Sequence, residues 1–457
     1  MRNYFDGLAE STRAKLKAFR KDRRGSIAQM AAVSAIPMLI CVGVAVDTVR
    51  VSYTSQKLAS TLDAAALAAA GADQSLSKAE VKALAKKYVE SNFVDPDQIA
   101  ILDFDIINTD EKIVVKGTAR VKTALMMLAQ VNYVDVKLSS EVVKSGSNVE
   151  VSLVLDNTTS MSSNMTDLKN AAKKFIDKVV TTSQTPYYSK VAIIPYNMGV
   201  NLGGLAASAR GALITTGPDT VPGHATYTFK NPSNSDKTFN ISTCVSERTG
   251  TEAYTDAGVA TNPVGRAYTP GSANPCIAAQ FLPLTSDITT LTNSINSMAS
   301  GSSTAGQVGI AWGWYALSPN FGLWAGASVP AAYTAPNTRK VMVLMTDAEY
   351  NSTYCNGVIT GVPTTSGSGS ASDHINCAAT NGSSYAQSKS LCLAMKLSGI
   401  EIYTIEFKLD TTVTARVDLM KDCATDSSHR VTASNATELT AAFEKIAGSL
   451  TSMRVSK

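Results

Sequence analysis

An uninterrupted apolar run near the N-terminus constrains the fold of this 457-residue chain more than any other feature. The run covers residues 26–46, SIAQMAAVSAIPMLICVGVAV, and contains no charged side chain. At the rise of an α-helix a run of this length extends about 30 Å, the hydrocarbon thickness of a bilayer. Pro37 would disrupt a helix in water, but a bilayer helix tolerates proline because the freed backbone groups can be satisfied locally. The run therefore predicts one transmembrane helix.

The charges that flank this run predict its orientation. Residues 1–25 are rich in Lys and Arg, so the positive-inside rule places this basic tail in the cytoplasm. The whole chain has a formal charge of +4, which leaves the rest of it slightly acidic and gives no support to a nucleic-acid-binding face. The alternative is a cleaved secretory signal, which has a shorter apolar core followed closely by a small-residue cleavage site. Because the run is longer and continues into DTVRVSYTSQK, we expect a retained anchor.

Residues 47–146 predict a helical stalk and a small α+β module. Ala- and Leu-rich sequence without proline follows the span, so the helix is expected to continue to about Gly71. A second helix is predicted in LSKAEVKALAKKYVESNF, where apolar residues recur at helical spacing. Three alternating runs, IAILDFDII, KIVVKGTARV and VDVKLSSEVV, predict strands, and the short apolar TALMMLAQV precedes the last of them.

Residues 147–457 show a different pattern of predicted strands and helices. Apolar runs typical of buried strands, VEVSLVL, KVAIIPY, KVMVLMTD and IEIYTIEF, alternate with helix-like segments such as SSNMTDLKNAAKKFIDKVV. This alternation indicates an α/β fold with a mostly parallel sheet covered on both faces. Two long insertions interrupt it, near residues 199–283 and 348–384, and loops of that length are functional or disordered unless they are ordered by cross-links.

Cysteine usage indicates an oxidising compartment. Of the seven cysteines, Cys41 lies in the span and an even number lie beyond it. These are Cys244, Cys276, Cys355, Cys377, Cys392 and Cys423. Three disulfides are therefore permitted, although six cysteines can pair in many ways. Pairing neighbours in sequence would staple each insertion internally and join the last two cysteines, but the sequence leaves the pairing open.

Two of the predicted strands are followed by an aspartate. Asp156 follows VSLVL and Asp347 follows KVMVLMT, and ligands of open α/β sheets bind outside the carboxyl ends of the strands. Asp156, Thr158 and Ser160 place three oxygen donors in one strand-to-helix loop. Oxygen ligands with few full charges suit Mg²⁺, although the same spacing of hydroxyls is also found in helix caps.

At these residues the chain resembles von Willebrand factor A domains, whose metal-ion-dependent adhesion site begins with such a loop. The family pattern also has a threonine from a second loop and an aspartate from a third, and Thr304 in SGSSTAGQ and Asp347 in VLMTDAEYN match these positions. Thr158 replaces the first serine of the pattern, and Thr159 and Ala348 stand where the family commonly has glycine. The resemblance implies a doubly wound A-type sheet that binds Mg²⁺, with Mn²⁺ or Ca²⁺ as alternatives. The implied ligands are Asp156, Thr158, Ser160, Thr304 and Asp347.

Over nearly its full length the chain is similar to TadG-like proteins of bacterial tight-adherence (Tad, or Flp) pilus assembly systems. The similarity is carried by RRGSIAQMAAVSAIPMLICVGVAVD, QKLASTLDAAALAAAGA, LVLDNTTSM, IAWGWYALSP and VLMTDAEYN. It implies an inner-membrane protein with a cytoplasmic N-terminus and a periplasmic A domain that helps to assemble or anchor an adhesive pilus. The implied partners are other pilus-assembly or minor pilin proteins, bound through a carboxylate on their surface.

Two other functions are alternatives to pilus assembly. A membrane-tethered adhesin or sensor unrelated to pili would carry the same A domain. A metal-dependent hydrolase is disfavoured because the sequence has no GxSxG motif, no phosphate-binding glycine loop and no histidine-assisted nucleophile. We therefore expect no enzymatic activity, no nucleic-acid partner and no small-molecule substrate.

Overall fold

The computed structural model describes residues 17, 25–70, 72, 77–93, 100–108, 112–143, 147–185, 187–270, 274–363 and 366–451. The contacts divide the chain into two compact units, one of residues 1–145 with 453–457 and the other of residues 146–452. The basic tail predicted over residues 1–25 lies outside the described residues, apart from Lys17 and Gly25.

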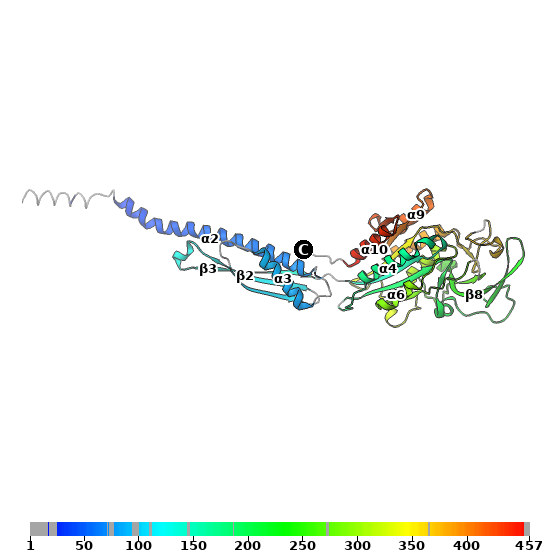
Figure 1. Ribbon diagram of the computed structural model, residues 1–457. Coiled ribbons are helices and arrows are strands. Elements are labelled where there is room, and N and C mark those ends of the chain that lie inside the picture. The colour runs from blue at the N-terminus through cyan, green and yellow to red at the C-terminus, as the bar shows by residue number, and fades with distance from the viewer. Residues whose placement is uncertain are drawn as a thin grey trace, which may run out of the picture. The chain divides into compact units, whose positions relative to one another are not determined.

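The first unit is built on one long helix, α2 (Gly25–Ala70), drawn in blue in Figure 1. Apolar side chains in its first half, such as Met30, Val33 and Met38, are exposed. Within the part of the chain that the structure describes, α2 is the one helix long and apolar enough to cross a membrane. The expected continuation of the helix beyond the apolar run is confirmed, since it ends at Ala70.

The second half of α2 packs on a small antiparallel sheet with the order β1-β2-β3. The elements here are α3 (Lys78–Asn92), β1 (Ala100–Asn108), β2 (Lys112–Lys122), the 3-10 helix η1 (Met126–Ala129) and β3 (Tyr133–Val143). Leu58 and Leu62 of α2 are fully buried against Ile113 and Val115 of β2. The alternating pattern of the strands thus gives the sheet one apolar face, which the helices cover.

The second unit is built on a six-stranded sheet with the order β10-β5-β4-β11-β14-β15. The strands are β4 (Asn148–Asp156), β5 (Ser189–Tyr196), β10 (Leu282–Thr285), β11 (Thr338–Thr346), β14 (Glu401–Phe407) and β15 (Arg430–Ala433). Neighbouring strands are parallel except at the edge, where β10 is antiparallel to β5. Counted along the chain, this is the 3-2-1-4-5-6 order of doubly wound folds, so the predicted fold class is confirmed.

Helices cover both faces of this sheet. One face carries α4 (Met165–Val179), α6 (Ile288–Asn296) and α10 (Ala436–Thr451), and the other carries α7 (Gly306–Tyr315), α8 (Ser384–Leu397) and α9 (Thr414–Cys423). In β4, Leu153 and Leu155 face the first group and Val154 faces the second. Because successive side chains of a strand point to opposite faces, a continuous apolar run is what a sheet buried on both sides requires.

The two insertions fold into structure that the sequence did not predict. The first contains α5 (Ala206–Arg210), β6 (Val200–Asn201), β7 (Thr226–Lys230), β8 (Asp236–Ser246) and β9 (Gly265–Thr269), and the second contains β12 (Tyr354–Cys355) and β13 (Val358–Ile359). They share a core in which Phe229 and Phe239 of the first insertion pack with Val358 and Ile375 of the second. The three disulfides pair neighbours in sequence, Cys244–Cys276, Cys355–Cys377 and Cys392–Cys423.

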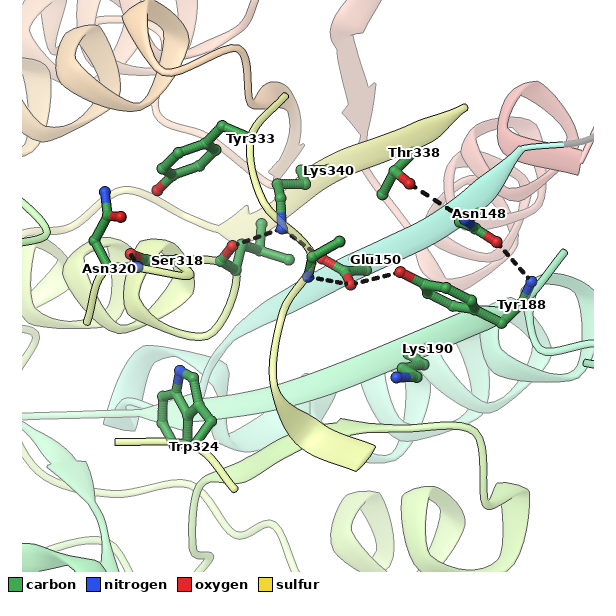
Figure 2. A network of polar contacts seen from close by, with 12 residues as sticks. Asn148, Glu150, Tyr188, Lys190, Ser318, Asn320, Trp324, Tyr333, Thr338 and Lys340 are labelled. Atoms are coloured by element: carbon green, nitrogen blue, oxygen red, sulfur yellow. Dashed lines mark hydrogen bonds and ion pairs between the residues drawn. The ribbon is translucent and has the colours of Figure 1, made fainter. Parts of the chain in front are cut away.

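A buried polar network lies at the amino ends of the two central strands (Figure 2). Glu150 of β4 and Lys340 of β11 are register partners, and Lys340 Nζ lies 2.5 Å from Glu150 Oε2. Lys340 also donates to the carbonyl oxygen of Leu317 at 2.9 Å. Glu150 Oε1 accepts from the Tyr188 hydroxyl at 3.0 Å and from the N–H of Ala331 at 2.8 Å. Such additional hydrogen bonds are what a buried ion pair needs to offset its desolvation.

Candidate metal centre

The centre is built around Asp156, the last residue of β4, at the carboxyl edge of the sheet. Its side chain is fully buried. Asp156 Oδ2 accepts a hydrogen bond from Thr346 Oγ1 at 2.6 Å and from the Tyr196 hydroxyl at 3.1 Å. These two residues end β11 and β5, the strands on either side of β4. The parallel sheet therefore brings the three strand ends together and fixes the carboxylate between them.

The loop after β4 wraps the other oxygen of the same carboxylate. Asp156 Oδ1 accepts from the N–H of Thr158 at 3.0 Å and from Thr158 Oγ1 at 2.6 Å. The hydroxyl oxygens of Thr158 and Ser160 lie 3.0 Å apart, and Ser160 is exposed. The structure thus gathers Asp156, Thr158 and Ser160 in one place, with one hydroxyl open to the surface.

The second loop, which contains Thr304, is joined to the first by backbone hydrogen bonds. The carbonyl oxygen of Ser302 accepts from the N–H of Thr159 at 3.2 Å and from Thr159 Oγ1 at 3.0 Å. The N–H of Gly301 donates to the carbonyl oxygen of Asn157 at 2.9 Å. Thr159, which stands where glycine is common in the family, therefore uses its extra hydroxyl to join the two loops.

Thr304 itself is buried and joins the second loop to the third. Its N–H donates to Asn351 Oδ1 at 2.9 Å, and its carbonyl oxygen accepts from the N–H groups of Asn351 and Ser352 at 3.0 and 2.9 Å. The three predicted loops are therefore linked in a chain of hydrogen bonds at one edge of the sheet.

The third loop turns sharply after Asp347, which is partly buried. Ala348 adopts a φ of +55°, a left-handed conformation that favours glycine. Its N–H donates to Thr346 Oγ1 at 2.8 Å, and its carbonyl oxygen accepts from the Tyr385 hydroxyl at 3.0 Å. The glycine common at this position in the family thus has a conformational reason, and this chain holds alanine there by hydrogen bonds.

Two influences act on the charge of the Asp156 carboxyl. Burial and the negative charge of Asp347 raise the pKa of the Asp156 carboxyl above its usual range. A divalent cation between the two carboxylates would offset both effects. Among the described residues no group of three or more His, Cys, Asp or Glu is placed to hold a metal, so a site here would depend on hydroxyl oxygens. Two carboxylates and neighbouring hydroxyls are a donor set that fits Mg²⁺.

Three residues that support the centre were not anticipated from the sequence. Tyr196 and Thr346 donate hydrogen bonds to Asp156. Their positions at the ends of strands that neighbour β4 were the feature of the sequence that could have predicted this contact. Asn274, in the first insertion, is buried, and its Oδ1 accepts from Ser302 Oγ at 3.0 Å and Ser303 Oγ at 2.6 Å. No sequence pattern pointed to Asn274, because it lies far along the chain from the loop that it contacts.

The N-terminal part of the chain matches a known protein family. Residues 25–72 match the family model described as putative Flp pilus-assembly TadE/G-like. The N-terminal segment is TadE/G-like. The match covers the whole of α2, and the chain joins this TadE/G-like segment to an A-type sheet, as the resemblance in sequence predicted. No curated protein matches the chain in sequence.

Several solved structures are similar to the chain at low identity. The pilus adhesin SpaC from Lactobacillus rhamnosus GG, in its open conformation, has 14% identity over 78% of this chain and 34% of its own, with a TM-score of 0.36. The von Willebrand factor domain of the type V pili tip protein Mfa5 from Porphyromonas gingivalis has 12% identity over 67% of this chain and 95% of its own, with a TM-score of 0.38. This chain thus spans about a third of SpaC.

Proposed function

We propose that this chain is a membrane-anchored component of a Tad (Flp) pilus system whose A-type domain binds a partner protein through a divalent cation. The observation that carries the proposal is the presence, on one chain, of a TadE/G-like helix and a hydroxyl-lined pair of carboxylates at the carboxyl edge of the sheet. In this proposal α2 anchors the chain in the bacterial inner membrane, with the N-terminus in the cytoplasm. The three disulfides support a periplasmic location for the A-type domain.

The residues that would hold the cation are the five of the sequence pattern. They are Asp156, Thr158, Ser160, Thr304 and Asp347. When bound, Mg²⁺ supplies a positive charge with a coordination position that a carboxylate of another protein can fill. A pilus-assembly or minor pilin protein with an exposed Asp or Glu is the partner that this chemistry would recognise.

The chain's own side chains prepare this centre. Tyr196 and Thr346 both donate hydrogen bonds to one oxygen of Asp156. These bonds hold the carboxylate in place at the carboxyl edge of the sheet. Thr159 keeps the first and second loops together through Ser302. Ser160, exposed beside Thr158, leaves the centre accessible from outside.

The proposal is tested by titrating MgCl₂ and MnCl₂ into the full chain in detergent, after treatment with a chelator, and measuring the heat of binding. Ser160→Ala is the variant to compare, because Ser160 is exposed and its loss leaves the buried Asp156 contacts intact. We expect the wild type to bind and Ser160→Ala to bind about tenfold or more weakly. Ser163→Ala, also exposed on the same loop, is the matched control and should bind as the wild type does. Equal binding by both variants, or none by the wild type, would refute the metal centre.

The pilus role is tested separately in the bacterium. Replacing the native chain by the Ser160→Ala variant should reduce the number of surface Tad pili, while Ser163→Ala should leave it unchanged. A normal number of pili in cells that lack the chain altogether would refute the assembly or anchoring role and would favour an adhesin or sensor.

A further inference from the structure

The connection between β2 and β3 is unusually apolar for a surface loop. It runs over residues 123–132, TALMMLAQVN, and includes η1. Within it Met127 is 50% exposed and Val131 is 38% exposed. Tyr133, at the start of β3, is also exposed. The tip of this hairpin thus presents large apolar side chains outward, where a soluble domain would have polar ones.

The loop lies against the last turns of the apolar part of α2. Gly43 and Asp47, one helical turn apart, are buried, whereas Val42, Val44 and Val46 on the rest of the helix surface are exposed. A Cβ at Gly43 would lie 2.5 Å from the Cβ of Leu125, so the loop and the helix approach as closely as glycine allows. Figure 1 shows this connection at the end of the small sheet, beside α2.

Asp47 fixes the loop to the helix. Its carboxylate accepts hydrogen bonds from the N–H groups of Ala124, Leu125 and Met126, at 2.8, 3.0 and 2.7 Å. A carboxylate next to an apolar span would be costly beside lipid, and the three N–H donors satisfy it within the protein.

Other backbone groups of the loop are paired within the protein as well. Besides the three N–H groups that Asp47 accepts, the N–H of Gln130 donates to the carbonyl oxygen of Met127 at 2.9 Å, and that of Val131 to the carbonyl oxygen of Met126 at 3.1 Å. Thr123 donates its N–H to the carbonyl oxygen of Asn132 at 3.1 Å. Irregular backbone is tolerated next to hydrocarbon only when its polar groups are paired in this way.

The strands next to the loop, and α2 beyond Asp47, carry residues typical of a membrane interface. Tyr133 and Tyr53 are 54% and 63% exposed, and the guanidinium of Arg120 lies 5.5 Å from the centre of the Tyr133 ring. Lys122, exposed, is the register partner of Tyr133. Tyrosine and basic side chains gather at the headgroup level, where one end of the side chain is apolar and the other is hydrated.

We propose that the β2–β3 connection is a second membrane contact, which lies at the acyl-chain and headgroup boundary of the same bilayer that α2 crosses. This inference rests on the proposed function in one respect, that α2 is a membrane anchor. The occupant is lipid, because the exposed apolar side chains of the loop continue those of α2 at the level of Gly43 and Asp47. The small α+β unit is then held on the membrane surface by two points, not by the helix alone.

The test uses the full chain in vesicles of phosphatidylcholine and phosphatidylglycerol, some of which carry bromine on the acyl chains as a tryptophan quencher. A tryptophan is introduced at one exposed position at a time. Leu39→Trp reports on the span, Met127→Trp on the loop, and Ser139→Trp on β3 further from the tip, on the same face as Tyr133. The emission of the three native tryptophans is subtracted using the wild type.

We expect bromine near the headgroups to quench Met127→Trp and to shift its emission to shorter wavelength, and deeper bromine to quench Leu39→Trp. Ser139→Trp should not be quenched. If Leu39→Trp is quenched and Met127→Trp emits like Ser139→Trp, the loop contact is refuted while the anchor stands. If neither Leu39→Trp nor Met127→Trp is quenched, the anchor itself is refuted and the loop proposal with it.

Discussion

At the scale of single residues, buried charges divide into two kinds. Glu150 is paired with Lys340 and fully hydrogen-bonded at the amino ends of the strands. Glu247, which follows β8, is buried, and among the described residues it forms no ion pair. Its oxygens accept from Gln307 Nε2 at 3.1 Å and from the N–H of Tyr354 at 3.3 Å, so it links the first insertion to α7 and to the second insertion. The two glutamates should respond differently to mutation and pH.

Glu247 should make stability fall as the pH rises. Burial raises its pKa to about 7, whereas the ordinary pKa of an exposed glutamate is 4.5. Between these two values the folded state binds more protons than the unfolded state, so the free energy of unfolding decreases with increasing pH and the penalty is complete above pH about 7. Glu247→Gln should remove this dependence and be more stable than the wild type at pH 8 by roughly 2–3 kcal/mol.

Urea unfolding at pH 5 and pH 8, followed by tryptophan fluorescence, checks this prediction. The three tryptophans, Trp312, Trp314 and Trp324, all lie in the A-type unit and report on it alone. Asp177→Asn, an exposed carboxylate on α4, should leave the difference between the two pH values as in the wild type. A Glu247→Gln variant with the wild-type pH dependence would contradict the assignment.

Lys340 should be costly to remove by itself. Lys340→Met leaves Glu150 as an uncompensated buried charge, and loss of one partner of a buried pair costs about 3–5 kcal/mol. Adding Glu150→Gln should recover most of this loss, because the remaining hydrogen bonds from Tyr188 and Ala331 can be made to an amide oxygen. Urea unfolding of Lys340→Met, Glu150→Gln and the double variant measures both effects, and additive losses in the double variant would show that the pair is not coupled.

At the scale of elements, the insertions shape the candidate metal centre. Asn274 of the first insertion holds the second loop through Ser302 and Ser303, and the N–H of Ser368 in the second insertion donates to Ser303 Oγ at 2.7 Å. The Cys244–Cys276 disulfide cross-links the first insertion close to Asn274, whereas Cys392–Cys423 joins α8 to α9. The first disulfide therefore lies near a residue that contacts the second loop, and the second disulfide joins two helices. The two disulfides close loops of similar length.

Removing either disulfide should lower the stability, but only one of the two removals should also weaken metal binding. The sequence separations are 32 for Cys244–Cys276 and 31 for Cys392–Cys423, so loss of either should reduce the free energy of unfolding by about 3–4 kcal/mol. Only the Cys244→Ser, Cys276→Ser variant should also weaken Mg²⁺ binding, by about tenfold. Calorimetric titration of both double variants tests this, and equal Mg²⁺ affinities would show that the insertion does not position the second loop.

At the scale of the whole molecule, the chain consists of two units with separate cores. The first has a core of α2, α3 and the small sheet, and the second has its own cores on both faces of the A-type sheet. Units with separate cores are expected to fold by themselves. The A-type unit should therefore not need the TadE/G-like helix for its stability.

Residues 147–451 expressed alone should retain the stability and the metal affinity of the full chain. The tryptophan-detected urea midpoint should agree between the two proteins, because all three tryptophans belong to this unit. A midpoint shifted well beyond experimental error, or Mg²⁺ binding seen only with the full chain, would show that the units depend on each other.

The sequence by itself determined the features that follow from local patterns of apolar and polar residues. The apolar run predicted a long helix, and the alternation of buried strands with helices predicted a doubly wound sheet, because burial requires apolar residues at the period of each element. The positions of Asp156 and Asp347 at strand ends could be predicted for the same reason, since parallel strands end at the same edge.

Only the tertiary structure decided how distant segments meet. Asn274 contacts Ser303 of the second loop, and Glu247 contacts Gln307 of α7. Asp47 of α2 contacts the β2–β3 connection, so all three have partners far away in the chain. Each of these contacts joins two segments that the fold brings within hydrogen-bond distance, and no repeating pattern in the sequence marks them as partners. Such pairings leave no local signal, because a buried polar residue is identified by the groups that surround it and not by its neighbours in sequence.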